Sequence, residues 1–236
     1  MGINERRERE RAERKTLIMN CAKDLILDRG VESLSMMDIA QKAELSKATL
    51  YLYFPSKELL FLEICNASAV QFIEHFRARL CTGLTAIETI KLYWQCYLDM
   101  FGESDEIMIF FKMWQYLAPG YPFLSLEGTE RPLMIFEFYT AIQDMIVQGV
   151  AEDTFDPAVD PAMIARTLLS LFSTVIANSA KTPKTARNVR FIVNELTKIF
   201  QIMLRGIIRD GLDRSLLDLP ALPEEHTHKT GARKKE

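Results

Sequence analysis

Apolar residues recur at helical spacing along most of this 236-residue chain. Near the N-terminus, two adjacent rows of apolar residues four apart mark one helix face: Leu17, Ile18, Cys21, Ala22, Leu25 and Ile26. Gly30 follows this face and predicts the end of the helix. Because no run alternates apolar and polar residues between hairpin turn signals, the pattern predicts an all-α protein.

Three further helices are each preceded by a serine that can cap them. Ser35 stands three residues before Asp38, the spacing of a capping box, while Ser46 and Ser56 precede the next two helices. The helices after Ser35 and Ser46 are short and are joined by a tight connection at residues 44–45. Packed on the longer first helix, they would form a helix-turn-helix unit.

The short helix after Ser46 has two different faces. Leu50 and Phe54 are four residues apart and are expected to point into the core. The outward set supplies one cation and three hydroxyl groups, from Lys47, Thr49, Tyr51 and Tyr53. Phosphate oxygens accept hydrogen bonds from such groups, so the spacing fits a DNA-binding helix. It equally fits a plain helical hairpin with an exposed tyrosine.

An ordered series of short motifs extends over residues 18–64. It comprises Gly30, Ile39-Ala40, Ala43-Glu44-Leu45-Ser46 and Thr49-Leu50-Tyr51-Leu52-Tyr53-Phe54-Pro55-Ser56-Lys57-Glu58. In this order the motifs resemble the TetR family of bacterial transcriptional regulators. Two departures from the family pattern are Ser35-Met36 in place of a Thr-Thr pair and Glu44 in place of the turn glycine. The second departure is expected to strain the turn or to bring a carboxylate near DNA.

The resemblance implies a homodimer that binds a double-stranded operator and is released from it by a small-molecule effector. Carried over position by position, it implies DNA contacts by Ser35, Ser46, Lys47, Ala48, Thr49, Tyr51, Leu52, Tyr53 and Lys57. The hydroxyls and the Lys57 cation would bind phosphates, whereas Lys47, Ala48 and Leu52 would influence which bases are preferred. The function implied is a transcriptional regulator, more specifically a repressor.

The chain is accordingly divided into four parts: a helix-turn-helix domain (1–56), a connecting helix (57–80), a helical effector-binding and dimerisation domain (81–220) and a disordered tail (221–236). Expected helices in the second domain are Ala86–Phe101, Asp105–Leu117, Arg131–Val150, Asp160–Ala180 and Lys184–Asp210. Breaks between them are marked by Gly102, residues 119–122, Gly149, Asp156-Pro157 and Pro183.

Aromatic rings concentrate between residues 91 and 140, which hold 13 of the 23 aromatic residues and both tryptophans. Such a cluster is typical of a packed core, and it also suits an apolar ligand cavity. The resemblance favours the cavity, for a lipophilic or aromatic effector; a lipophilic cation would fit the ring faces and Glu137. The candidate effector contacts are Tyr93, Trp94, Tyr97, Phe110, Trp114, Gln115, Phe138, Phe172 and Asn178.

The last two expected helices carry more apolar surface than one face requires. Burial within a single chain would explain this surface. A four-helix interface with a second copy would explain it too, and the resemblance implies that arrangement. The candidate interface residues are Leu168, Phe172, Val193, Leu196, Phe200, Met203 and Ile207.

Charge is spread almost evenly along the chain. There are 29 Lys and Arg against 32 Asp and Glu, a net charge of −3, and residues 1–60 hold 11 basic and 10 acidic side chains. DNA binding would therefore depend on a few placed contacts rather than on a basic domain. In the arginine-rich segment 6–15, interleaved glutamates favour i,i+4 pairs on a solvated helix, and contacts to DNA are the alternative.

Other functional classes find little support. The four cysteines form no C-x-x-C pair, only His75 lies outside the polar tail, and no phosphate-loop or hydrolase motif is present. We therefore expect no enzyme activity, no metal and no cofactor.

The longest nearly apolar stretch, residues 168–177, is shorter than a membrane helix, so we expect no membrane contact and a cytoplasmic location. The alternative function is an all-helical ligand-binding protein or enzyme with a vestigial helix-turn-helix.

Overall fold

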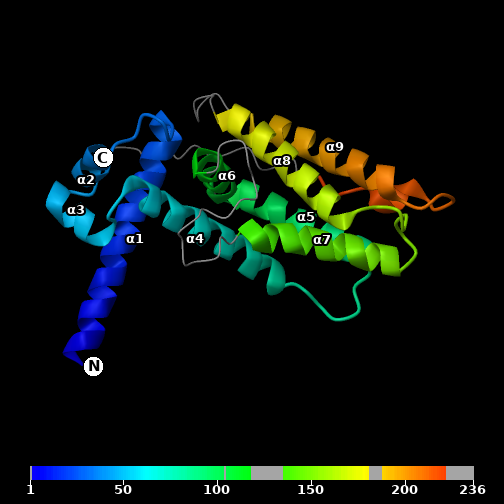
Figure 1. Ribbon diagram of the computed structural model, residues 1–236, viewed down its shortest axis with the longest axis horizontal. Helices are drawn as coiled ribbons and strands as arrows, with labels where there is room; N and C mark the ends of the chain where they lie inside the picture. The colour runs from blue at the N-terminus through cyan, green and yellow to red at the C-terminus, as the bar shows by residue number, and fades with distance from the viewer. Residues whose placement is uncertain (1, 104, 118–134, 181–187, 222–236) are drawn as a thin grey trace, which may run out of the picture.

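The computed structural model describes residues 2–103, 105–117, 135–180 and 188–221 (Figure 1). These residues form an all-helical molecule, with the helix-turn-helix unit at one end and a larger helical body beside it (Figure 1). Within the described ranges, the β-type pairing is confined to an isolated antiparallel bridge between Phe155 and Ile208. The predicted breaks at 119–122 and Pro183, and the predicted tail from residue 222 onward, lie outside the described residues.

Three helices form the N-terminal unit: α1 (Ile3–Arg29), α2 (Met36–Lys42) and α3 (Lys47–Tyr53). Their ends follow the signals in the sequence. The hydroxyl oxygens of Ser35 and Ser46 accept hydrogen bonds from the backbone N–H groups of Asp38 (3.2 Å) and Thr49 (3.0 Å). Gly30 ends α1 in a left-handed conformation, with φ +82°. Each cap satisfies a backbone group that a helix terminus would leave unpaired, so helices as short as α2 and α3 begin where predicted.

Six helices make up the body: α4 (Lys57–Arg77), α5 (Ala86–Glu103), α6 (Glu106–Leu117), α7 (Ile135–Ala151), α8 (Pro161–Ala180) and α9 (Val189–Ile207). Helix α4 begins at the Ser56 cap beside α3 and runs into the body, where it packs on α6, α5 and α7. Helices α8 and α9 pack on each other along one edge of the body (Figure 1). The helix ends predicted near Gly102 and Gly149 fall one and two residues later, because α5 ends at Glu103 and α7 at Ala151.

Helix α8 has the length and composition of a membrane span over Pro161–Ser179. Its apolar character thus extends beyond residues 168–177, where the sequence pattern placed it. Core helices of soluble proteins share this composition, and α8 packs on α6, α7 and α9. Because 39% of the stretch is buried inside the chain, part of its apolar surface remains uncovered.

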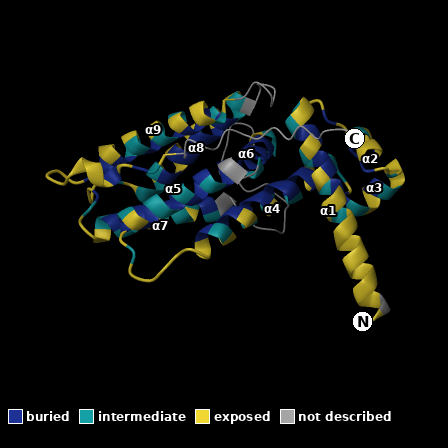
Figure 2. Ribbon diagram, turned by 180° about the vertical axis from the view of Figure 1, so that it is seen from behind, coloured by how far each residue is buried: buried dark blue, intermediate teal, exposed yellow. Residues whose placement is uncertain are grey.

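The buried side chains form one continuous core that extends from the helix-turn-helix unit through the body (Figure 2). At the far end of the body, the chain after α7 folds back on Gly149. A Cβ at Gly149 would stand 2.1 Å from the fully buried ring of Phe155. The N–H groups of Thr154 and Phe155 donate to the Gly149 carbonyl oxygen at 2.8 and 3.0 Å. Glycine is required at this position because the Phe155 ring approaches its backbone closely, and not because it ends α7.

Gly149→Ala is expected to lower the free energy of unfolding by about 1–3 kcal/mol, because the added methyl group overpacks the Phe155 site. Gly206, inside α9, is the matched control, since no atom lies within 4 Å of its Cβ position. Gly206→Ala should stabilise the protein by up to about 1 kcal/mol through helix propensity. Chemical unfolding of the three proteins measures both effects, and equal effects would contradict the packing of Phe155 on α7.

Candidate functional site

Every side chain of α3 that was predicted to contact DNA is exposed or partly exposed. These side chains are Lys47, Ala48, Thr49, Tyr51, Leu52 and Tyr53. Leu52 is 76% exposed and Tyr51 is 39% exposed. Leu50 and Phe54 point inward as predicted, with 0% and 2% of their surface exposed. These two anchors set the rotation of α3, so its mixed polar and apolar face is held toward solvent.

Ser35 and Ser46 are caps as well as predicted DNA contacts, and both are exposed. The hydrogen bond between Ser35 and the Asp38 carboxylate lowers the pKa of Asp38. Ser46 Oγ lies 2.8 Å from Thr49 Oγ1, so one of these hydroxyls donates to the other. The second hydroxyl keeps its proton for an outside acceptor such as a phosphate oxygen.

The turn between α2 and α3 is closed by Glu44, which has φ +54°. Its N–H donates to the Gln41 carbonyl at 3.2 Å, and the N–H of Leu45 donates to the Ala40 carbonyl at 2.9 Å. These are the two bonds of a Schellman motif, whose left-handed position favours glycine. The departure seen in the sequence therefore does place a side chain in a strained conformation, and the Glu44 carboxylate is exposed beside α3.

The two lysines of the predicted interface lie over aromatic rings. Lys47 Nζ is 5.8 Å from the centroid of the Tyr51 ring on the same helix. Lys57 Nζ, at the start of α4, is 5.3 Å from the Phe61 ring and 4.9 Å from the Tyr116 ring of α6. Lys57 thus lies between α3 and the body, a position that sequence spacing does not predict.

Polar contacts that the sequence analysis missed join α1 to the body. Lys23 Nζ lies 2.7 and 2.8 Å from the two carboxylate oxygens of Glu106, at the start of α6. Ser68 of α4 donates to the same carboxylate at 2.5 Å. Lys112 is buried and donates to the Ile26 carbonyl at 3.3 Å, near the end of α1. The sequence did contain a signal for the Lys112 contact. Lys112 is the one cation in the apolar run 107–114, and a buried cation requires a polar partner.

Seven of the predicted effector contacts are buried side chains of the body: Tyr93, Trp94, Tyr97, Phe110, Trp114, Phe138 and Phe172. The rings of Phe110 and Phe138 stack at 4.9 Å, and those of Trp94 and Tyr97 at 5.4 Å. The other two predicted contacts, Gln115 and Asn178, are exposed, and Gln115 donates a hydrogen bond to the Ser173 carbonyl at 3.2 Å.

Two polar atoms inside the aromatic cluster lack a hydrogen-bond partner among the described residues. They are the hydroxyl oxygen of Tyr97 and Nε1 of Trp114, whose side chains are each about 1% exposed. Trp94 differs, since its Nε1 donates to the Pro220 carbonyl at 3.0 Å. Burial raises the pKa of Tyr97, so its hydroxyl stays protonated and remains a donor. Each of these unpaired buried donors carries a desolvation cost.

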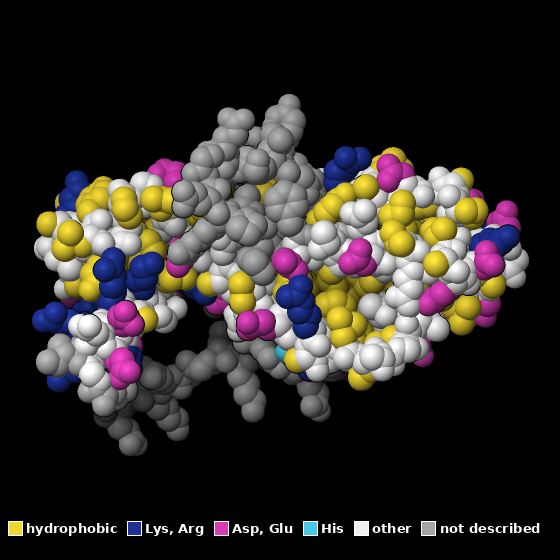
Figure 3. Space-filling model, turned by 60° about the horizontal axis from the view of Figure 1, so that its bottom comes forward, with side chains coloured by type: hydrophobic (Ala, Val, Ile, Leu, Met, Phe, Trp, Pro, Cys, Tyr) yellow, Lys and Arg dark blue, Asp and Glu magenta, His cyan; other side chains and the backbone are white. Residues whose placement is uncertain are grey.

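A cleft of about 440 Å³ opens on the face formed by α4, α7 and the chain between α4 and α5. Figure 3 shows this face hollowed, with hydrophobic side chains at the floor and charged groups at the margin. The floor includes Ile73, Phe76 and Met145, and the ring of Phe76 packs on Tyr93 at 5.2 Å. The charged lining residues are Arg77, Glu137 and Asp144, and Arg77 pairs with Glu137. The cleft is thus apolar within, acidic at the rim and adjacent to the aromatic cluster.

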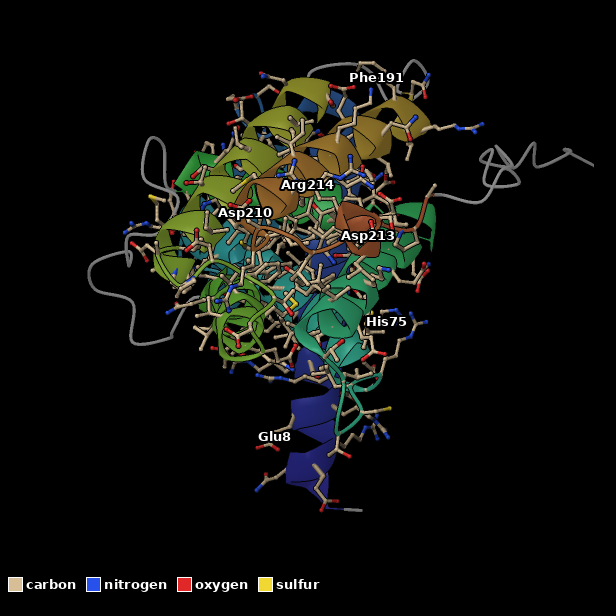
Figure 4. The ribbon with its side chains drawn as sticks, turned by 90° about the vertical axis from the view of Figure 1, so that its right-hand side faces the viewer. Glu8, His75, Phe191, Asp210, Asp213 and Arg214 are labelled. Carbon is tan, nitrogen blue, oxygen red and sulfur yellow. The ribbon has the colours of Figure 1, made fainter. Side chains whose placement is uncertain are left out.

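The predicted interface residues are mostly part of the chain's own core. Leu168, Phe172, Val193, Leu196, Phe200 and Ile207 are buried in the single chain, and Met203 is partly exposed. Their apolar surface is buried where α8 packs on α6, α7 and α9 within the chain. Other apolar side chains of α8 and α9 remain exposed: Met163, Leu171, Phe191 and Ile202. Figure 4 shows Phe191 at the outer margin of the body, on α9.

Residues 18–64 match the model of a family described as bacterial regulatory proteins, tetR family. The chain is 41% identical over 54 residues to YuxN of Bacillus subtilis, an uncharacterized HTH-type transcriptional regulator; the match covers 23% of this chain and 19% of YuxN. It is 22% identical over 158 residues to the HTH-type transcriptional repressor KstR2 of Mycolicibacterium smegmatis, covering 66% of this chain and 74% of KstR2. The chain therefore spans about a fifth of the first of these relatives and about three quarters of the second.

Solved structures share the fold. The fatty acid degradation regulator FadR from Bacillus halodurans has a TM-score of 0.60 at 16% identity, over 82% of this chain and 95% of that chain. CprB from Streptomyces coelicolor, in complex with its operator sequence, has a TM-score of 0.59 at 17% identity, over 88% of this chain and 94% of that chain. Residues 18–64 are thus similar to the tetR family of bacterial regulatory proteins, and the described residues share the fold of these solved regulators.

Proposed function

We propose that the protein is a sequence-specific transcriptional repressor that binds operator DNA as a homodimer and is released by a small lipophilic effector. The observation that carries the proposal is the outer face of α3. It presents hydroxyls, a cation and the apolar Leu52 side chain together, and two buried anchors hold it toward solvent. Hydroxyls and cations suit phosphates, and Leu52 suits a thymine methyl group. The operator complex of the structurally similar CprB supports this use of the fold.

Helix α4 supports a mechanism for release, because it takes part in both sites. It begins directly after α3, and its C-terminal part supplies Ile73, Phe76 and Arg77 to the cleft. An effector that fits the cleft better when α4 has shifted would favour that position of α4. Since α3 is joined to α4 through three residues, the shift would move the recognition face and weaken DNA binding.

The cleft and the aromatic cluster together indicate the chemistry of the effector. The rim carries two carboxylates against one guanidinium, which favours a cationic or neutral polar head group over an anion. An apolar portion would lie on the floor and reach toward the cluster through Phe76. There the free donors of Tyr97 and Trp114 would bind an acceptor atom of the effector.

For DNA binding, Tyr51→Phe is expected to weaken affinity about tenfold or more, because a hydrogen bond to a charged phosphate is lost. Lys57→Ala should weaken binding to all sequences and reduce the salt slope by about 0.9, the effect of one phosphate contact. Tyr139→Phe removes a hydroxyl from α7 and serves as the control. Fluorescence anisotropy with a duplex selected from a random pool measures the DNA affinity of each variant.

If no duplex is selected, the alternative of a ligand-binding protein or enzyme with a vestigial helix-turn-helix is favoured.

For the effector, decyltrimethylammonium below its micellar concentration should bind more tightly than decanoate, and Asp144→Asn should narrow the difference. Lys91→Gln is the control, since Lys91 does not line the cleft. Titration calorimetry gives the affinities. Bound ligand should lower operator affinity, and operator DNA should lower ligand affinity by the same factor, typically about 5–150-fold. Equal binding of the two probes in both proteins would overturn the assignment of the acidic rim.

For the homodimer, Phe191→Glu combined with Ile202→Glu should produce a folded monomer in sedimentation. The two residues are eleven apart on α9 and share its outer face, so a buried pair of charges would be costly in an interface there. The exposed Val147 of α7 supplies the control, Val147→Glu. Leu196→Glu is expected to unfold the chain instead, because Leu196 is already buried within it. A dimer that survives the double substitution would place the interface on another surface.

A further inference from the structure

The first helix extends far beyond the domain that it belongs to. Helix α1 begins at Ile3, whereas Ile18 is its first buried residue among those described. We call residues 4–15 the arm; they are exposed apart from Lys15, which is partly buried (Figure 2). At 1.5 Å per residue, the arm is about 18 Å long. The alternating Arg and Glu residues thus form a solvated helix, but the two signs of charge are not evenly distributed around it.

Three arginines form a stripe along one face of the arm. Arg7, Arg11 and Arg14 stand at positions i, i+4 and i+7, which share one side of an α-helix. All three are exposed, and none of them has an acidic partner among the described residues. The stripe therefore presents three unpaired guanidinium groups, spread over about 10 Å of helix axis.

The remaining arginines of the arm are neutralised by neighbours. Arg6 pairs with Glu10 at 2.8 Å, and Arg9 lies 3.8 Å from Glu13. Glu5, also away from the stripe, accepts a hydrogen bond from the N–H of Gly2 at 2.9 Å. Outside the stripe and the bordering Lys15, two arginines stand against four glutamates, because Glu8 is acidic too, so the arm is cationic on one face and net acidic elsewhere.

The cationic face points toward the helix-turn-helix. Counting from Arg14, Ile18 and Ala22 follow at the same helical phase, and both are fully buried against the domain core. Lys15 borders the stripe, and its Nζ lies 5.4 Å from the Phe54 ring at the end of α3. The same Nζ is 3.8 Å from Glu63 of α4. The stripe thus continues the side of α1 that meets the Phe54 ring and α4.

The arm also has a defined direction relative to the proposed dimer. Figures 1 and 4 both show α8 and α9 along one edge of the molecule and the arm leaving from the opposite edge. In a dimer joined through α8 and α9, the two arms would point away from the twofold axis. Each arm would therefore run outward, past the DNA bound by its own α3.

We infer that Arg7, Arg11 and Arg14 bind the phosphate backbone of duplex DNA outside the bases that α3 reads. Guanidinium groups match phosphate geometry, and three of them on a stiff helix span about three base pairs of backbone. The contact would raise affinity without adding sequence information. This inference rests on the proposed DNA-binding function and extends its interface beyond the helix-turn-helix.

The test compares two variants that each remove two charges from the arm. Arg7→Gln/Arg11→Gln changes the stripe, and Arg6→Gln/Arg9→Gln changes the paired face. Glutamine is a good helix former, so both variants should keep the helical content of the wild type. The probe is the selected duplex in two lengths, one ending at the selected bases and one extended by ten mixed-sequence base pairs at each end.

On the extended duplex, the stripe variant should reduce the salt slope by about two and weaken binding at least tenfold at 0.1 M salt, because two phosphate contacts are lost. On the short duplex it should match the wild type, and the paired-face variant should match the wild type on both. If the two variants behave alike on the extended duplex, the inference is wrong. The proposed function is tested separately, since Lys57→Ala weakens binding to both lengths when α3 and α4 bind DNA.

Discussion

The relation between the two parts of this protein depends on the carboxylate of Glu106. It binds Lys23 of α1 and Ser68 of α4 from the first turn of α6, and the Lys23 and Glu106 side chains are only 15% and 17% exposed. Removing one partner would leave a largely desolvated charge, which is far more costly than the intact pair is stabilising. Helices α1, α4 and α6 are therefore held in one arrangement where the helix-turn-helix meets the body.

A second contact along α6 makes this arrangement stiff. Lys112 donates to the Ile26 carbonyl, so α6 holds α1 near its C-terminus as well as through Lys23. Lys57 adds a third connection, through its position over the Tyr116 ring of α6. A displacement of α4 or α6 by a bound effector would have to rearrange these polar contacts together. The proposed coupling between the cleft and the recognition face would pass through this shared support.

Placement of charge, rather than its amount, decides the proposed interaction with DNA. The chain has a net charge of −3, and its first sixty residues are nearly neutral. In the arm, Arg6 and Arg9 form ion pairs with glutamates. Arg7, Arg11 and Arg14 lie on one side of the helix because of their spacing along it. A count of residues averages over these faces, so it underestimates how cationic the surface toward the helix-turn-helix is.

The sequence determined those features that depend on residues close together along the chain. Ser35 and Ser46 cap the helices that they precede, and Leu50 and Phe54 turn inward. Each of these outcomes is settled within one or two helical turns, by backbone hydrogen bonds and helical phase. The all-α fold and the helix-turn-helix were predictable for the same reason.

Only the tertiary structure decided which apolar faces meet and which distant groups pair. Leu196 and Phe200 have the apolar pattern of an interface, yet they are buried within their own chain. Gly149 resembles a helix stop but accommodates the ring of Phe155, and Lys23 finds its partner 83 residues away. Periodicity shows that a face must be covered, but the covering element is selected by packing among helices that are remote in sequence.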